Sequence, residues 1–342
     1  MKDGTRLSRR TVLKASLAGL AMTPGWARFA HAQHKTTTVN LQLGWLANNN
    51  QLGEACAKNL GYYEEEGINL VIQPGGPNID GVAVVASGRH EIGQVSSSPS
   101  LMLAASQKIP VKCIAVGAQE HPYAYFSLPK NPVRTPQDLV GKKVGIQATA
   151  RVLLNALLKK HNISEKDLQI VVIGSDMSPL LTGQVDVVSG WLTNTTALKP
   201  LGPDRIDLRL WDAGVRLYAL PYYSTQSLIE KKPDMLAGFL RATAKGWAYA
   251  RANTDKAVDF LVKEYPNLVR NDELEASQSF LKFAFNGATK ANGWGTFDKG
   301  VWQEQIGLYD ELKQFTAGAP KLDDVVTTAI LEKSADGRPK IG

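Results

Sequence analysis

Apolar and polar residues alternate from Val39 to Leu43, and this period of two predicts a β-strand. From Leu52 to Leu60 the apolar residues recur at helical spacing instead. This second run stops at Gly61, a residue suited to the left-handed conformation in which many helices end. The sequence therefore predicts a strand, a turn over residues 44–53 and a helix.

The predicted turn contains one indole and three carboxamides, Trp45 and Asn48-Asn49-Asn50. Open α/β sheets bind ligands at the carboxyl ends of their strands, which is where this turn lies. An indole offers a flat stacking face, and a carboxamide both donates and accepts hydrogen bonds. We therefore expect Trp45, Asn48 and Asn50 to bind a neutral, planar solute. The alternative is that Trp45 belongs to the core and the asparagines only cap the helix.

The same order of features occurs twice in the chain. A helix ends at Gly88, an acidic residue and a short strand follow, and the polar cluster Ser96–Ser98 comes next. A second helix ends at Gly183, and its acidic residue and strand lead to the segment Trp191–Thr196. This repetition predicts two similarly built α/β lobes that face one cleft, although two common βα units could also agree by coincidence. The polar residues predicted to contact the solute in these two places are Ser97, Ser98, Trp191 and Asn194.

Two apolar and aromatic segments, Ala118–Phe126 and Leu220–Ser227, are predicted to cross between the lobes. Their tyrosines Tyr123 and Tyr222 are candidates for the cleft floor, the alternative being that they point into the core. Thr149 follows a predicted strand and is expected to cap the next helix, where free backbone N–H groups favour an electronegative ligand edge. The helices after Pro233 are expected to complete the first lobe. We thus expect a first lobe of residues 33–122 and 224–342 and a second lobe of residues 123–223.

Most of the net positive charge of the chain lies in its first 32 residues. The 342 residues carry a formal charge of +7, from 39 Lys and Arg and 32 Asp and Glu residues. The first 32 residues hold six of those basic residues and one of the acidic ones, which leaves 33 basic and 31 acidic side chains in the rest. This nearly neutral remainder gives no electrostatic reason to expect nucleic acid as a partner.

The first 32 residues resemble an export signal. Ser8-Arg9-Arg10-Thr11-Val12-Leu13-Lys14 precedes a weakly apolar run, and Ala30-His31-Ala32 is typical of a cleavage site. The paired arginines are similar to those of twin-arginine signals, which export folded proteins, whereas an ordinary secretory signal is the alternative. We expect an extracytoplasmic protein that starts near Gln33, and one without a lipid anchor because no Cys lies near the cut.

Recognised catalytic signatures are missing from the sequence. It contains no Gly-x-Ser-x-Gly, no phosphate-binding Walker loop, no His-Glu-x-x-His and no dinucleotide-binding glycine fingerprint. The four histidines after the leader are isolated, so we expect no metal site, no cofactor and no catalytic residues. Cys56 and Cys113 lie in apolar segments and are expected to be buried thiols, with a disulfide as the alternative.

Several segments together resemble the solute-binding proteins of ABC importers. They are Gly44-Trp45 with Asn48-Asn49-Asn50, the range 61–68, Pro74-Gly75-Gly76-Pro77, Val85-Ala86-Ser87-Gly88, the range 138–145 and the range 302–306. The resemblance is to the branch that handles thiamine pyrimidine precursors, nitrate, sulfonates and taurine. It implies a type II periplasmic-binding-protein fold, in which two hinged α/β lobes close on a small solute. It also implies a periplasmic location and a membrane permease as partner, and we expect a monomer.

Within that branch, the first turn with its Trp and Asn residues is similar to the pyrimidine-precursor binders, and Thr193-Asn194 resembles their contact in the second lobe. Binders of anions more often present a basic group at the first turn, and this turn has none. Two alternatives stay open. One is a binder of an organic anion such as a sulfonate, nitrate, taurine or an aromatic acid. The other is a pyrimidine-synthesising enzyme, since such enzymes share the scaffold.

Overall fold

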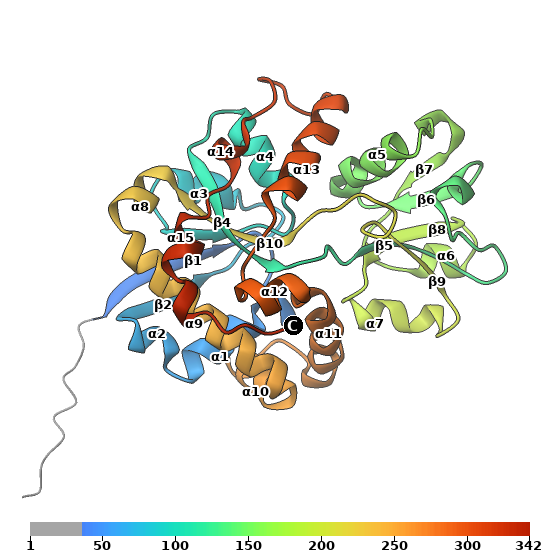
Figure 1. Cartoon of the computed structure of the whole chain (residues 1–342). Coiled ribbons are helices and arrows are strands. Elements are labelled where there is room, and N and C mark those ends of the chain that lie inside the picture. Colours follow the sequence, from blue (N-terminus) through green and yellow to red (C-terminus); the bar gives the residue numbers. More distant parts are fainter. Residues whose placement is uncertain (1–35) are drawn as a thin grey trace, which may run out of the picture. The chain divides into compact units, whose positions relative to one another are not determined.

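The computed structural model describes residues 36–342, so the predicted export signal lies outside the described residues. The described chain contains two five-stranded sheets (Figure 1). In sheet order, the first consists of β2 (Ile68–Gln73), β1 (Thr37–Leu43), β3 (Ile92–Gln94), β10 (Ala219–Thr225) and β4 (Val111–Ala118). The second consists of β7 (Gln169–Val172), β6 (Lys143–Ile146), β8 (Val187–Trp191), β5 (Tyr123–Ser127) and β9 (Ile206–Arg209).

Parallel pairing brings particular strand ends together in each sheet. β1 is parallel to both β2 and β3, and Leu43 at the end of β1 pairs with Gln94 at the end of β3. β6 is likewise parallel to β7 and β8. β10 runs antiparallel to β3 and β4, and β5 runs antiparallel to β8 and β9. The turns that follow β1 and β3 therefore leave the first sheet at the same edge.

Helices follow most strands in both halves of the described chain. Those between and after strands of the first sheet are α1 (Leu52–Asn59), α2 (Tyr62–Glu65), α3 (Gly81–Ala86), α4 (Pro99–Ser106), α8 (Gln226–Lys231), α9 (Pro233–Ala252), α10 (Thr254–Glu264), α11 (Arg270–Ala284), α12 (Gly287–Asn292), α13 (Lys299–Glu311), α14 (Leu322–Val325) and α15 (Ala329–Lys333). Those among the strands of the second sheet are α5 (Arg151–Lys160), α6 (Ser178–Leu181) and α7 (Thr195–Leu198).

The strand, turn and helix predicted at the start are confirmed. β1 ends at Leu43, α1 begins at Leu52, and Gly61 follows with a φ of 78°. The predicted second crossing, Leu220–Ser227, is wrong in its position. It coincides mainly with β10, a fully paired inner strand of the first sheet, so the chain returns from β9 before Ala219. The error arose because a buried inner strand is as apolar and aromatic as a crossing segment.

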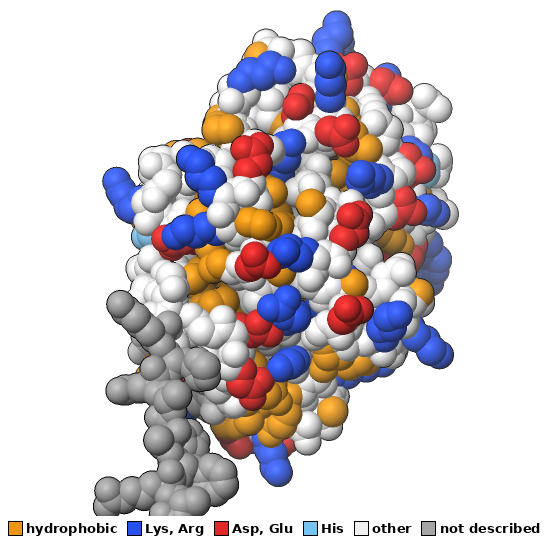
Figure 2. All heavy atoms as spheres, turned by 60° about the vertical axis from the view of Figure 1, so that its left-hand side comes forward, with side chains coloured by type: hydrophobic (Ala, Val, Ile, Leu, Met, Phe, Trp, Pro, Cys, Tyr) orange, Lys and Arg blue, Asp and Glu red, His pale blue; other side chains and the backbone are white. Residues whose placement is uncertain are grey.

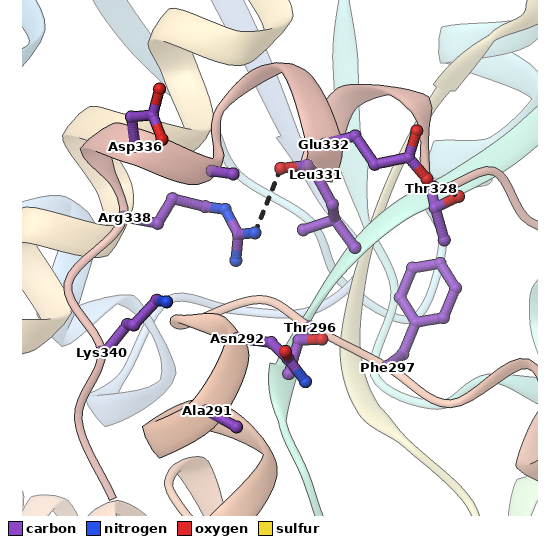
Figure 3. Close-up of a pocket in the computed structure, with 11 residues that line it drawn as sticks. Ala291, Asn292, Thr296, Phe297, Thr328, Leu331, Glu332, Asp336, Arg338 and Lys340 are labelled. Atoms are coloured by element: carbon purple, nitrogen blue, oxygen red, sulfur yellow. Dashed lines mark hydrogen bonds between the residues drawn. The ribbon is translucent and has the colours of Figure 1, made fainter.

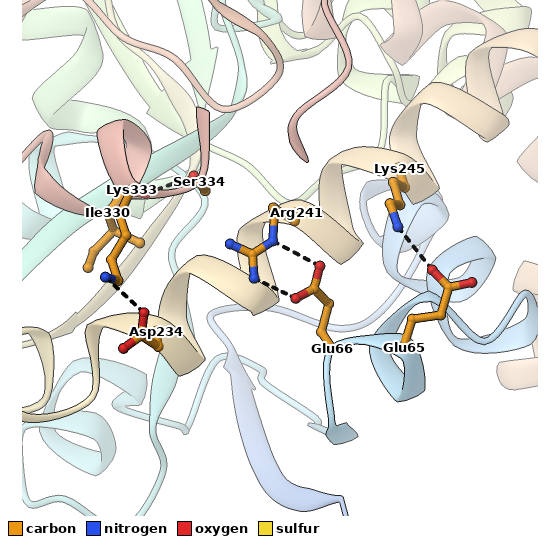
Figure 4. Close-up of polar contacts among 8 residues, drawn as sticks. All are labelled: Glu65, Glu66, Asp234, Arg241, Lys245, Ile330, Lys333 and Ser334. Carbon is orange, nitrogen blue, oxygen red and sulfur yellow. Dashed lines mark hydrogen bonds and ion pairs between the residues drawn. The ribbon is translucent and has the colours of Figure 1, made fainter. Parts of the chain in front are cut away.

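The thiols and the outer surface also agree with the sequence. Cys56 and Cys113 are both buried and unpaired, as predicted. On the face in Figure 2, basic and acidic side chains are interspersed, which matches the nearly neutral charge. Ion pairs join α9 to its neighbours (Figure 4), namely Arg241 with Glu66, Lys245 with Glu65, and Asp234 with Lys333 of α15. None of the helices in residues 36–342 combines the length and the hydrophobicity that a bilayer-spanning helix requires.

The approach of α1 to α9 depends on two glycines. A Cβ added at Gly246 would lie 2.0 Å from the carbonyl oxygen of Gly53. A Cβ added at Gly53 would lie 2.2–2.4 Å from ring atoms of Trp247. Both distances are far below van der Waals contact, and the first obstacle is backbone that cannot rotate away. The position of α1, and of the turn that precedes it, is therefore set by this close helix contact.

We expect Gly246→Ala to destabilise the protein by about 1–3 kcal/mol, because overpacking forces the two helices apart and such backbone shifts cost about this much. The matched control is Gly307→Ala, at an exposed position of α13 where an added Cβ meets nothing within 4 Å. It should be neutral or stabilise by about 0.5–1 kcal/mol, since alanine favours the helix. Urea unfolding measures both, and equal effects would contradict the assigned packing.

Candidate ligand-binding site

Three loops meet where β1 and β3 end. They are residues 44–51, residues 74–77 and residues 95–98. A Cβ on Gly75 would lie 2.3 Å from the Leu43 carbonyl oxygen and 2.5 Å from the Trp45 nitrogen, and a Cβ on Gly44 would lie 2.8 Å from the Gln94 carbonyl oxygen. Only glycine allows these backbones to approach so closely. The loops therefore form one tightly packed edge that presents the first predicted ligand residues.

Trp45 is 49% exposed at this edge, which excludes the alternative that it is a core residue. Asn48 does cap a helical turn, the 3-10 turn η1 (Asn49–Gln51). Its Oδ1 accepts from the backbone N–H of Asn50 at 2.9 Å, while its own N–H donates to Gln51 Oε1 at 3.1 Å. Both ideas about this turn thus hold in part, with a capping Asn48 and an accessible indole beside it.

Ser98 and Tyr222 lie below this edge and already have protein partners. Ser98 is fully buried, and its hydroxyl donates to Gln305 Oε1 at 2.5 Å. Tyr222 is fully buried as well, packs against Trp294, and donates its hydroxyl to Glu54. In this structure both residues support the loops from within.

A histidine connects the first sheet to the second. His121 Nδ1 accepts from the backbone N–H of Tyr123 at 3.2 Å, so the proton of the neutral ring is on Nε2, which lies 2.6 Å from the Ser97 hydroxyl. The ring also meets Trp191 edge-on, with 4.9 Å between centroids. Burial lowers the pKa of His121 to about 3, so the ring stays neutral at physiological pH. His121 thus joins Ser97, which follows β3, to Trp191, which ends β8.

Tyr123 belongs to the same cluster. It stacks edge-on against Tyr125, pairs with Trp191 in the sheet, and donates its hydroxyl to Ser189 Oγ at 2.7 Å. One connected cluster therefore contains three of the predicted ligand residues, Ser97, Tyr123 and Trp191, together with His121. Sequence reasoning missed His121, because an isolated histidine before a proline gives no signal of what it touches.

At the edge of the second sheet, Thr149 and Asn194 are both exposed, after β6 and β8 respectively. The prediction that Thr149 caps α5 is wrong. Thr149 lies inside the 3-10 turn η3 (Ala148–Ala150), Ala150 precedes α5, and no side-chain hydrogen bond caps that helix. The tighter turn continues directly into the helix, so the extended residue that a side-chain cap requires does not occur at Thr149.

Helix α11 is a second connection that the sequence did not reveal. It packs against η1 and also against α7, beside which it lies in Figure 1. Ser279 donates to the carbonyl oxygen of Leu192 at 3.2 Å, and Lys199 pairs with Glu275 at 2.8 Å. Burial raises the pKa of Glu273, and a hydrogen bond from the backbone of Asn49 opposes that rise. One helix therefore contacts the turns that carry Asn48 and Asn194.

None of the ten predicted ligand residues lines either of two hollows found among the described residues. The first, of about 580 Å³, lies near the end of the chain (Figure 3). There the guanidinium of Arg338 donates to the carbonyl oxygens of Leu331 and Trp294 and to Ser334 Oγ. Arg338 thus secures the last segment of the chain. The second hollow, of about 390 Å³, includes Gln305, the partner of Ser98.

We expect the buried, neutral His121 to make stability depend on pH. The unfolded chain takes up a proton below a pKa of about 6.5, whereas the folded chain does so only near pH 3, so acid favours unfolding. Between pH 7 and pH 5 this linkage should cost about 2 kcal/mol. His121→Gln should lose that much less stability over the same interval, as measured by urea unfolding at both pH values. Equal losses in the two proteins would show that the ring is not held neutral.

Comparison with known proteins gives a family and a fold. The family model described as "NMT1/THI5 like" matches residues 48–257, more than half of the chain. The chain is 26% identical over 294 residues to the riboflavin-binding protein RibY of Chloroflexus aurantiacus, covering 82% of this chain and 83% of that one. It is 26% identical over 283 residues to a formylaminopyrimidine-binding protein of Halalkalibacterium halodurans, covering 80% and 84%.

An enzyme is also similar. A 4-amino-5-hydroxymethyl-2-methylpyrimidine phosphate synthase of Legionella pneumophila is 27% identical over 238 residues, covering 67% of this chain and 74% of that one. Among solved structures, the periplasmic aliphatic sulphonate binding protein SsuA of Escherichia coli aligns with a TM-score of 0.63 and 17% identity, covering 85% of this chain and 92% of that one. The likeness confirms the predicted type II periplasmic-binding-protein fold.

Proposed function

Because the chain belongs to the NMT1/THI5-like family, we propose that it is the solute receptor of an ABC importer. It binds a small, neutral, planar heteroaromatic solute of the pyrimidine type. Trp45 stacks on the solute, Asn48 and Asn50 bind its edge, and Asn194 completes the site from the second sheet. The observation that carries this proposal is the link through His121, which joins Ser97 of the first sheet to Trp191 of the second.

The chemistry of the exposed groups supports a neutral ligand over an anion. The exposed or half-buried groups at the two edges are an indole, carboxamides and hydroxyls, and residues 44–51 and 95–98 contain no Lys or Arg. Arg151, two residues after Thr149, is paired with Glu165. Lys199, near Asn194, is paired with Glu275. An anion would lack an unpaired cation at these places, whereas a heterocycle with ring nitrogens and amino groups suits carboxamides.

The names of two similar proteins agree with this class. One binds formylaminopyrimidine and one binds riboflavin, and both compounds contain a nitrogen heterocycle. We propose that the solute contacts both edges at once, so that its binding energy favours a closed arrangement of two hinged lobes. The permease, the periplasmic location and twin-arginine export belong to the same proposal.

Catalysis is the competing function, because a pyrimidine phosphate synthase is also similar. Cys56 and Cys113 are buried, and burial raises the pKa of the Cys56 thiol to about 12. Both ring nitrogens of His121 already have hydrogen-bond partners, the Ser97 hydroxyl and the backbone N–H of Tyr123. The described residues contain no group of three or more His, Cys, Asp or Glu that could hold a metal. These observations favour binding without turnover.

We expect Trp45→Ala to weaken binding of a pyrimidine solute at least about 10-fold, since stacking on a base contributes about 1–3 kcal/mol. Stability should hardly change, because the indole is 49% exposed. Leu46→Ala, at the 58% exposed neighbouring position, is the matched control and should keep the affinity within about threefold. Titration calorimetry with formylaminopyrimidine and riboflavin, with a sulfonate as the anion comparison, measures these affinities.

Three results would contradict the proposal. Tight binding of the sulfonate alone would identify an anion receptor. Conversion of a bound pyrimidine by the purified protein, followed by mass spectrometry, would identify an enzyme. Equal losses of affinity in Trp45→Ala and Leu46→Ala would move the site away from the indole.

A further inference from the structure

A buried carboxyl lies beneath the ligand turn. Glu54, in the first turn of α1, is fully buried, and its neighbours Gln51 and Gln94 are each 3% exposed. Burying a carboxyl is costly unless it is neutral or well hydrogen-bonded. The influences on its pKa are burial, the Tyr222 hydroxyl and its own helix backbone, and no cationic side chain of the described residues is among them. A carboxyl in this setting needs a structural or functional reason.

The hydrogen bonds above Glu54 all run in one direction. The backbone N–H of Asn48 donates to Gln51 Oε1 at 3.1 Å, and Gln51 Nε2 donates to Gln94 Oε1 at 2.8 Å. Gln94 Nε2 then donates to Glu54 Oε1 at 3.4 Å, an atom that also accepts from the Tyr222 hydroxyl. Every donor therefore points toward the carboxyl. Because a carboxamide that donates at one end presents its oxygen at the other, the acceptor at Glu54 fixes the orientation of both glutamines.

We propose that Glu54 is a positioning residue for the ligand turn, and that its protonation state sets the shape of that turn through Gln94 and Gln51. The carboxylate strengthens the long contact to Gln94, since charge-assisted hydrogen bonds are shorter and stronger than neutral ones. A shorter contact to Gln94 would shift Gln51 as well, because the two side chains are hydrogen-bonded. Gln51 in turn accepts from the backbone N–H of Asn48, the residue that caps η1 close to Trp45. This role rests on the proposed function only for its effect on affinity.

Glu54 can ionise while the titratable groups around it stay neutral. Burial raises its pKa to about 7. The titratable groups that face it are Cys56 of the same helix, Tyr63 of α2, Tyr222 of β10 and Tyr265 after α10. Burial raises the pKa of each of these groups, that of Cys56 to about 12, so they stay neutral when Glu54 ionises. Its ionisation therefore falls in the physiological range without a compensating group.

The ligand-free protein provides the first test, by fluorine NMR after 5-fluorotryptophan labelling, with the Trp45 resonance assigned through Trp45→Phe. We expect that resonance to shift with a midpoint near pH 7 in the native protein. The shift should vanish in Glu54→Gln, which keeps the acceptor oxygen but cannot ionise. It should also vanish in Gln94→Met, which removes the hydrogen bonds that connect Glu54 to Gln51. Gln119→Met is the matched control, because Gln119 is also 3% exposed but its side chain donates to the carbonyl oxygen of Thr296, outside the row of hydrogen bonds from Asn48 to Glu54.

The control should retain the native shift although it loses a buried carboxamide. A pH-independent Trp45 resonance in the native protein, or a shift that persists in Glu54→Gln or Gln94→Met, would overturn the proposal. A second measurement compares affinity for formylaminopyrimidine at pH 6 and pH 8. We expect at least a threefold change in the native protein and none in Glu54→Gln. Absence of all binding would refute the proposed function, while the ligand-free resonance would still decide the role of Glu54.

Discussion

The arrangement of the candidate site depends on the neutral ring of His121. The Tyr123 N–H donates to one of its nitrogens, and the other lies against the Ser97 hydroxyl. Its face and edge are enclosed by Trp191 and Tyr123. A charged imidazolium could not accept from the backbone, so protonation would break the link between the sheets. Burial prevents this by making the charged form costly, and the strand ends of both sheets stay connected.

Close backbone packing determines which side chains remain accessible around this link. Gly44 and Gly75 bring the loops after β1 and β3 into contact with the 74–77 loop, and no larger residue fits at either position. The backbone of the turn is held from below by Gln51 and Gln94. The polar interior therefore fixes the turn, while Trp45 extends outward with half of its surface exposed. Such rigid support favours a first-sheet half of the proposed site that is formed before the ligand arrives, while closure of the two lobes supplies the other half.

Much of the fold could be predicted because its signals are local. The alternation in β1, the helical spacing in α1 and the left-handed Gly61 each depend on a few neighbouring residues. The contacts that build the site are between distant segments instead. His121 contacts Ser97 and Trp191, and α11 packs against η1 and α7. Hydrophobic periodicity predicts helices and strands, but it does not predict which distant residues come into contact. Leu220–Ser227 failed for a related reason, since its apolar pattern fits an inner strand as well as a crossing.

The candidate ligand residues show the same division. Trp45 and Asn48 were predicted because residues 44–53 themselves contain suitable groups for a ligand, and the structure places the indole at the surface and the carboxamide at a cap. Ser98 and Tyr222 are of equally suitable types, but their hydroxyls are bonded to Gln305 and Glu54. Residue type thus identifies what a side chain can bind, whereas burial and partners decide what it does bind. Glu54 illustrates this, because only its surroundings distinguish it from a surface glutamate.

The stacking of a solute on Trp45 can be seen in a crystal structure of the protein with the solute that it retains through purification, or with added formylaminopyrimidine. We expect density for one planar molecule stacked on Trp45 and hydrogen-bonded to Asn194, with His121 still bonded to Ser97. A molecule bound elsewhere, such as in the hollow beside Arg338, would contradict it, as would protein side chains that fill the space between Trp45 and Asn194.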